Sequence, residues 1–265
     1  MINVKSTLTY SFFKLFFHCI KDFLITIGNI GKDFSRVLYY VVRLRINASA
    51  TIEQSSRFAV DSLPITLTIV GMTSVIIAMQ IAPELAKQGA EGYMGMMSAL
   101  VMIRELSCIM SGFAIISMIG SSFASELASM AVGEQISAMH VLKVDPVEYL
   151  VVPRVLSGIL TMPFVFIVSS LVGLVCTCLV SYMTAGLSPL NFMTSLWQGL
   201  YLRDILIAML KASFFGGTIA LISCSCGYST RGGAKEVGES TTKAVVWSFV
   251  AIAVWDYIFA VLFYL

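Results

Sequence analysis

Long uncharged segments, separated by short charged ones, make up most of this sequence. No charged residue lies between Asp61 and Glu84, and none lies between Arg154 and Arg203. About 20 apolar residues form a helix long enough to cross the hydrocarbon core of a membrane. The pattern predicts an all-α integral membrane protein with five spanning helices, at about 62–83, 96–123, 155–183, 204–227 and 244–265.

The uncharged segment between Arg154 and Arg203 is longer than one span requires. The turn Gly186-Leu187-Ser188-Pro189 divides it, and polar residues follow that turn at Asn191, Thr194, Ser195 and Gln198. We interpret residues 187–202 as an outer segment that is interfacial or re-entrant, rather than as a sixth span.

The basic residues favour five spans with a cytoplasmic N-terminus. Most of the 17 Lys and Arg residues precede the first span or lie in the connections 124–154 and 228–243. Five crossings place all three regions in the cytoplasm, as the positive-inside rule requires, and the C-terminus on the opposite side. A sixth span would move Arg231, Lys235 and Lys243 outside.

The N-terminal segment, residues 1–57, differs in kind from the membrane-spanning part, residues 58–265. Its charged and polar residues Lys14, His18, Lys21 and Asp22 fall on one side of a helix. The other side is apolar and is formed by Phe12, Phe13, Phe16, Phe17, Ile20, Phe23, Leu24 and Ile27. This pattern predicts an amphipathic helix lying in the cytoplasmic interface. The alternative is a poor first spanning helix.

Composition supports the membrane interpretation. Hydrophobic residues make up 58% of the chain and charged residues only 12%, against about 25% charged in a soluble domain. These values exclude a disordered chain, a nucleic-acid-binding protein and a disulfide-rich secreted domain. The six cysteines include two C-x-C pairs within apolar segments, so we expect packing roles rather than a metal or redox site.

Several catalytic motifs are missing from the sequence. It contains no G-x-x-x-x-G-K-[ST] phosphate loop, no H-E-x-x-H zinc motif and no G-x-S-x-G serine motif. We therefore expect no catalytic residue, no metal site and no cofactor bound by this chain. If ATP is used, a separate subunit must bind it.

Four charged residues lie within predicted spans, at Arg104, Glu105, Lys211 and Asp256. Each costs about 2.5–3.5 kcal/mol at the centre of a spanning helix unless it is paired or hydrated. All four fall in the outer half of the bundle, so we predict a neutral network that lines a polar cavity or holds the helices together. Arg104 and Glu105 are adjacent and point about 100° apart, so they cannot face one partner.

The connection between the second and third spans is predicted to be structured. Residues 125–144 are typical of one helix, and Asp145-Pro146-Val147-Glu148 begins another, with Asp145 as its N-cap. The cytoplasmic segment 125–148 is suited to docking into a groove on a partner protein. Another interfacial helix is the alternative.

At these residues the chain resembles the MlaE (YrbE) family, the permeases of MCE-type ABC lipid transporters. The first matching block comprises Arg104-Glu105-Leu106, residues 124–130, residues 134–139, Val144-Asp145-Pro146 and residues 149–154. The second comprises Lys211, Phe215-Gly216, Cys226-Gly227, residues 232–234, Val237-Gly238, Thr241-Thr242, residues 244–246 and Asp256. The chain departs from the family at Ser107-Cys108, where Gly-Pro is usual, and at Ser117-Met118, where Gly-Arg is usual.

The resemblance implies a homodimeric permease in a bacterial inner membrane, with five spans and an interfacial N-terminal helix. Its partners would be a cytoplasmic ABC ATPase, a hexameric MCE-domain protein and a STAS-like protein. Its substrate would be phospholipid, moved between the inner and outer membranes. The coupling helix would lie at about 125–148, and the residues coupling it to the ATPase would be Glu126, Glu134, Gln135, Met139 and Asp145. The family's buried charged positions match Arg104, Glu105, Lys211 and Asp256.

Two other functions fit the residues without the resemblance. A secondary transporter or channel would use the four intramembrane charges as an ion relay, although five spans do not form the inverted repeats common in that class. A membrane scaffold would use the same charges only to hold its helices together.

Overall fold

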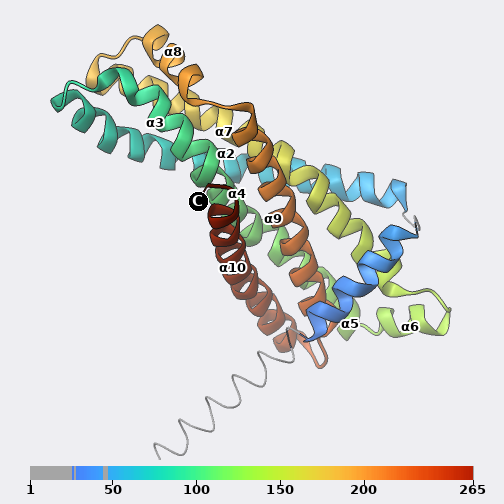
Figure 1. The fold of residues 1–265 in the computed structure, drawn as a ribbon. Coiled ribbons are helices and arrows are strands. Elements are labelled where there is room, and N and C mark those ends of the chain that lie inside the picture. Colours follow the sequence, from blue (N-terminus) through green and yellow to red (C-terminus); the bar gives the residue numbers. More distant parts are fainter. Residues whose placement is uncertain (1–25, 27, 44–46, 265) are drawn as a thin grey trace, which may run out of the picture.

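The computed structural model describes residues 26, 28–43 and 47–264, and these form an all-α bundle (Figure 1). Five helices in this part of the chain are long and apolar enough to span a membrane, as predicted. They are α2 (Ala48–Lys87), the segmented helix Glu91–Val132, the helix Val147–Ala185, α9 (Leu202–Tyr228) and α10 (Ala234–Tyr264).

The first span is much longer than the uncharged segment that predicted it. Asn47 caps α2, its side chain accepting a hydrogen bond from the amide of Ala50, and the helix continues for 40 residues. An α-helix of that length measures about 60 Å, twice the hydrocarbon thickness. Position 57, where the sequence placed the end of the N-terminal segment, therefore lies inside α2. The charges mark where the helix leaves the hydrocarbon core, not where it begins.

The second span contains two π-helical turns. Its parts in order are η1 (Glu91–Tyr93), α3 (Met94–Val101), η2 (Met102–Leu106), α4 (Ser107–Ile115), η3 (Ile116–Gly120) and α5 (Ser121–Val132), of which η2 and η3 are π-helical. A π turn holds one extra residue and rotates the side chains that follow it. Arg104 and Glu105 lie in η2.

Residues 187–202 do not form a sixth span. The third span comprises η4 (Val147–Val151) and α7 (Val152–Ala185), and it ends at Gly186, whose φ of +66° is left-handed. The short helix α8 (Pro189–Gly199) follows and packs on α3 at one end of the bundle (Figure 1). Its 11 residues measure about 17 Å, too little to cross the membrane. We refer to this end as the α8 end.

The opposite end, the α6 end, differs from its prediction. The expected single helix over residues 125–144 is wrong: α5 ends at Val132, and a separate helix α6 (Gln135–Val141) follows. The break occurs because Glu134 has a left-handed φ of +58° after Gly133, which an α-helix cannot continue through. The second part of the prediction is confirmed, since the Asp145 side chain accepts a hydrogen bond from the amide of Val147 at 2.9 Å.

An additional helix covers residues 28–42 at the α6 end. Asp33 on this helix accepts a hydrogen bond from Ser225 of α9, and Tyr40 donates one to Asp145. The two faces predicted for residues 12–27 lie outside the described residues, except for Thr26.

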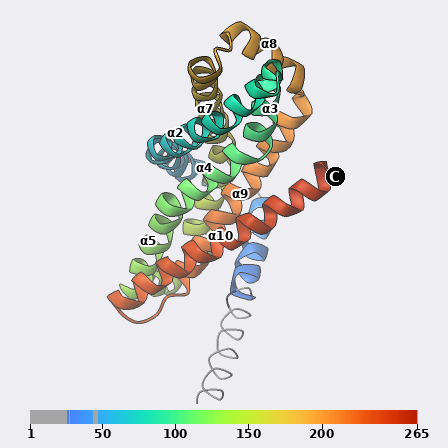
Figure 2. The ribbon, with the colours of Figure 1, turned by 90° about the vertical axis from the view of Figure 1, so that its left-hand side faces the viewer.

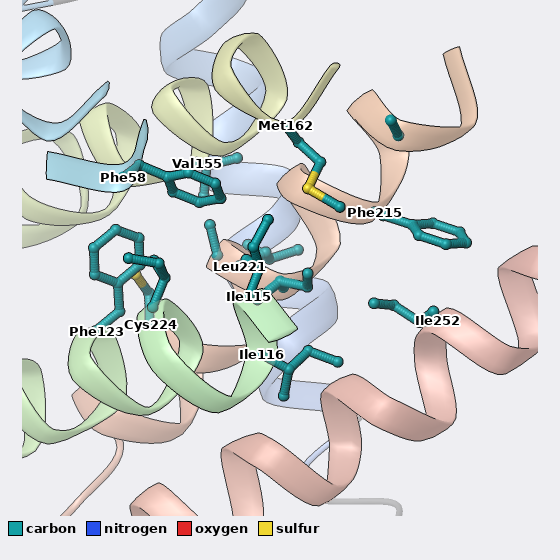
Figure 3. Packing of buried hydrophobic residues seen from close by; sticks show 14 of the residues in the cluster. Phe58, Ile115, Ile116, Phe123, Val155, Met162, Phe215, Leu221, Cys224 and Ile252 are labelled. Atoms are coloured by element: carbon teal, nitrogen blue, oxygen red, sulfur yellow. The ribbon is translucent and has the colours of Figure 1, made fainter. Parts of the chain in front are cut away.

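The main apolar core lies where the spans cross. Its buried side chains come from five different spans and include Phe58, Phe123, Val155, Met162, Phe215 and Ile252 (Figure 3). Figure 2 shows α10 running obliquely across the bundle, where it contacts α4, α5 and α9. This crossing brings Asp256 against the other charged residues.

Two glycines let α7 and α9 approach closely. A Cβ on Gly158 would lie 2.5 Å from the carbonyl oxygen of Gly216, and a Cβ on Gly216 would overlap the carbonyl of Gly158. Small residues at such crossings allow backbones to pack in membranes, where helix association depends on van der Waals contact.

Replacing Gly216 with alanine is expected to destabilise the protein by about 3 kcal/mol or more, because rigid backbone leaves the new methyl group no space. Thermal unfolding in detergent would measure the change. Gly238→Ala is the matched control, since nothing lies within 4 Å of its Cβ position. That control is expected to be neutral or about 1 kcal/mol stabilising, as for most glycines inside helices. Equal melting temperatures for Gly216→Ala and the wild type would contradict the close approach.

Candidate functional site

Lys211 is the centre of a charge cluster that joins three helices. Its Nζ lies 2.6 Å from Glu105 Oε2 in η2 and 2.5 Å from Asp256 Oδ1 in α10. The same Nζ donates to the backbone carbonyl of Arg104 at 3.3 Å. The Lys211 side chain is fully buried, whereas that of Glu105 is 36% exposed. The cluster is therefore open on the Glu105 side.

Arg104 faces a different partner, as expected for a residue adjacent to Glu105. Its guanidinium lies 3.0 Å from Asp204 Oδ2 and 4.8 Å from the centre of the Tyr264 ring. The five charged side chains are two cations and three carboxylates. The predicted formal neutrality is therefore wrong, because it omitted Asp204.

The sequence contained a signal for Asp204. This residue lies seven positions before Lys211 in α9, which is two helical turns, so the two side chains share a face. Asp204 is the first residue of the predicted fourth span, 204–227, where a carboxylate is also explained by the helix dipole. The structure buries it, with a side chain only 7% exposed.

A cavity of about 340 Å³ adjoins Arg104 towards the α8 end. Besides Arg104 and Asp204 it is lined by Arg203, Tyr201, Phe263 and Tyr264. Arg203 forms no ion pair with the described residues. A guanidinium beside aromatic rings is suited to a ligand that carries both a phosphate and apolar groups.

The residues predicted to couple to an ATPase fall into two groups. Glu134 and Gln135 are exposed at the start of α6, with Met139 half-buried on the same helix. Glu126 lies instead in α5, where it forms an ion pair with Arg154, and 2.9 Å separate Glu126 Oε2 from Arg154 Nη2. Asp145 is used within the chain, because it caps the next helix and accepts a 2.6 Å hydrogen bond from Tyr40. That bond raises the pKa of Tyr40 to about 12.

Arg154 is a structural residue that we did not single out. Its side chain is only 8% exposed, pairs with Glu126 and lies over the Phe123 ring, with 5.4 Å between the guanidinium carbon and the ring centre. The pair ties α5 to α7 at the α6 end. No signal in the sequence indicated this burial, because Arg154 lies just before the predicted span 155–183, where a basic residue is expected to face water.

No group of three or more His, Cys, Asp or Glu side chains in the described part of the chain is arranged to hold a metal ion. All five described cysteines are free, and Cys108 and Cys224 are buried in the apolar core. Cys108 and Cys224 therefore have the predicted packing role.

Protonation of Asp33 is expected to strengthen the docking of helix 28–42. Burial raises the pKa of this carboxyl, although Ser225, Arg36 and Lys32 oppose the shift. The docked state therefore binds the proton more tightly than the undocked state. Docking should strengthen as pH falls through the raised pKa, and the gain is complete below the ordinary carboxyl pKa of about 3.9.

Asp33→Asn should remove this pH dependence and stabilise the protein near neutral pH, because it removes the charge whose burial raises the pKa of the carboxyl. The asparagine oxygen can still accept the hydrogen bond from Ser225. Melting temperatures measured from pH 4.5 to 8 would test this, with Glu53→Gln as an exposed control on α2. A pH profile for Asp33→Asn identical to that of the wild type would contradict the assignment.

Comparison with known proteins gives the family. The model described as Permease MlaE matches residues 51–262. A probable ABC transporter permease protein of Synechocystis is 36% identical over 217 residues, which are 82% of each chain. Protein TRIGALACTOSYLDIACYLGLYCEROL 1, chloroplastic, of Arabidopsis thaliana is 37% identical over 86% of this chain and 65% of its own length. A probable ABC transporter permease protein of Rickettsia conorii is 33% identical over 91% of this chain and 93% of its own. These matches cover both the charge cluster and α6, and the chain therefore belongs to the MlaE family of ABC transporter permeases.

Proposed function

We propose that this chain is the membrane-spanning subunit of an ATP-driven phospholipid transporter. The observation that carries the proposal is the cavity beside Arg104, next to a partly buried cluster of five charges within a membrane bundle. The arginines offer a site for the lipid phosphate, and the surrounding aromatic rings offer apolar contact. The Arabidopsis relative carries the name of a galactolipid, which supports a lipid substrate.

ATP hydrolysis takes place on a separate subunit in this proposal, since the sequence contains no phosphate-binding loop. The short helix α6, with Glu134 and Gln135 exposed, would dock into that subunit. Two copies of the chain form the permease, and an MCE-domain hexamer on the periplasmic side receives or delivers lipid. A STAS-like protein binds the ATPase. The lipid then moves between the inner and outer membranes.

The proposed orientation places the α6 end in the cytoplasm of a bacterium and the C-terminus on the periplasmic side of the inner membrane. Basic side chains support this arrangement. Lys143 and Lys243 are exposed at the α6 end, with Arg231 between α9 and α10. By the positive-inside rule, this end faces the cytoplasm.

An ion relay is the second candidate, and the arrangement of Glu105, Lys211 and Asp256 favours it. Ionisable side chains within membrane spans mark ion pathways and proton relays in pumps and transporters. The two candidates differ in their requirement for ATP.

Reconstitution into vesicles with the co-purified ATPase would separate them. The expected result is ATP-dependent transfer of a fluorescent phospholipid, reduced at least about tenfold by Arg203→Ala and unaffected by Arg57→Ala. Arg57 is a suitable control because it is exposed and lies at the α6 end, far from the cavity. Ion flux without ATP, and no lipid transfer, would replace the proposal by the relay.

A further inference from the structure

Three adjacent cavities follow the inner side of helix 28–42 at the α6 end. Their volumes are about 560, 350 and 370 Å³. Arg36 lines both the first and the second, and Asn29, Ser229 and Arg231 line both the second and the third. Together they form one groove, which runs from the loop after α6 to the turn between α9 and α10. We call it the basic groove.

The cations of the basic groove have no carboxylate partner among the described residues. They are Lys32, Arg36, Lys143, Arg231 and Lys243. Most other described cations differ, because an ion pair is formed by each of Arg57, Lys87, Arg104, Arg154, Lys211 and Lys235. The exceptions are Arg203, and Arg43, which lies over the Tyr39 ring. Five cations that form no ion pair and line one groove are available to an anionic ligand.

Four carboxylates also line the groove, one fewer than the cations, so its lining carries a net positive charge. Each of the four is held by a bond to another group. Asp33 accepts from Ser225 at 2.6 Å, and Asp145 accepts from Tyr40 at 2.6 Å. Glu236 accepts from the backbone amide of Gly233 at 2.8 Å, and Glu239 pairs with Lys235. The first two bonds also fix helix 28–42 beside the groove at two points seven residues apart, so the groove is held open.

The outer side of helix 28–42 indicates where the groove lies relative to the membrane. Phe34, Leu38 and Val42 are 54%, 52% and 74% exposed, and they recur every four residues on one face. An exposed apolar stripe next to a basic side is the pattern of a helix lying in the membrane interface. The groove behind it therefore lies at the level of the lipid phosphates of the same leaflet.

We propose that the basic groove binds the phosphate-bearing headgroup of an anionic phospholipid from the leaflet in which helix 28–42 lies. This site is separate from the cavity beside Arg104, which lies towards the opposite end of the bundle. A lipid bound in the groove contacts helix 28–42, the loop after α6 and the turn between α9 and α10 at once. Its headgroup therefore holds the loop after α6 against the membrane surface.

Native mass spectrometry of the full-length protein would test the proposal. The protein, purified with its co-purifying subunits, would be exchanged into nanodiscs of phosphatidylcholine with 20% phosphatidylglycerol, and the retained lipids would be counted. The groove variant is Arg36→Gln/Arg231→Gln. The control is Arg57→Gln/Lys87→Gln, which removes the same charge from exposed, ion-paired residues outside the groove.

The groove variant is expected to retain phosphatidylglycerol at least about tenfold more weakly than the wild type, with the control unchanged. Equal retention by the groove and control variants would overturn the proposal. So would equal retention of phosphatidylcholine and phosphatidylglycerol by the wild type. If the first groove variant does not fold, Lys32→Gln/Lys143→Gln tests the same prediction.

Two further measurements identify the source of the phosphate and distinguish the basic groove from the cavity beside Arg104. Inorganic phosphate at 10 mM should not displace the retained lipid; displacement would show a site for free phosphate and overturn the proposal. Arg104→Gln should leave retention in the groove unchanged even if it abolishes lipid transfer. Loss of groove binding in Arg104→Gln would show that the retained lipid lies in the cavity beside Arg104.

Discussion

Lys211→Met is expected to destabilise the protein by about 3–5 kcal/mol, the cost of breaking a buried ion pair by removing one partner. Methionine fills a similar volume but leaves Glu105 and Asp256 facing each other without the ammonium group that lies within 2.6 Å of both. In a bundle of this size the melting temperature should fall by about 10 °C or more. Thermal unfolding in detergent, followed by the loss of monodisperse protein, measures the effect.

Two further variants show whether the stability lost in Lys211→Met comes from the two carboxylates left without a partner. Lys235→Met removes an exposed lysine whose ion pair with Glu239 is 3.7 Å long, and it should change stability by less than about 0.5 kcal/mol. The triple variant Glu105→Gln/Lys211→Met/Asp256→Asn removes all three charges and should recover most of the lost stability. If that variant folds but transfers no lipid, the charges act in transport. If it folds and transfers lipid normally, they only hold the helices together.

Glu134→Lys is expected to reduce recovery of the ATPase with the permease at least about tenfold, without affecting membrane insertion. The side chain is exposed at the start of α6, so the reversed charge disturbs no contact within the chain. Like charges opposed across an interface cost several kcal/mol. Lysine and glutamate are both unbranched at Cβ, so the left-handed backbone at this position costs about the same for either residue.

Co-purification from membranes in mild detergent would measure this effect. Glu53→Lys is the matched control, because it reverses an exposed carboxylate near the start of α2. Recovery of the ATPase with Glu134→Lys at the level of the wild type would exclude α6 as the docking helix. Glu134→Gly supplies a second comparison, since it removes the charge but favours the left-handed turn.

The number of spans could be predicted from the sequence because it depends on a strong local quantity, the length of apolar segments. The ends of the spanning helices could not be predicted in the same way. A helix such as α2 continues from the membrane into water, where charged residues stabilise it as well as apolar ones do. The pair Glu53 and Arg57 shows this, since it lies one turn apart on the exposed start of α2.

The charge cluster could be predicted only in part. The cost of burying a charge identified Arg104, Glu105, Lys211 and Asp256, but it did not identify how they pair. Pairing depends on the π turn at η2 and on the oblique crossing of α10, and both are set by packing between helices. Asp204 was missed because a carboxylate near the start of a helix is also explained by the helix dipole.

The break before α6 has a similar explanation. Gly133 was a visible signal, but glycines inside membrane helices are common, as Gly158 and Gly216 show. What distinguishes Gly133 is the residue that follows it, and no rule predicts a left-handed glutamate from sequence alone.

The π turns at η2 and η3 determine where the second span can differ in length between relatives of this chain. Each turn holds one residue more than an α-helix needs, so deleting one residue there leaves a continuous helix. The same deletion within α4 would rotate every later side chain by about 100° and turn the buried face of α5 outward. Among relatives of this chain, single-residue gaps within the second span should therefore fall at 102–106 or 116–120, and nowhere between them.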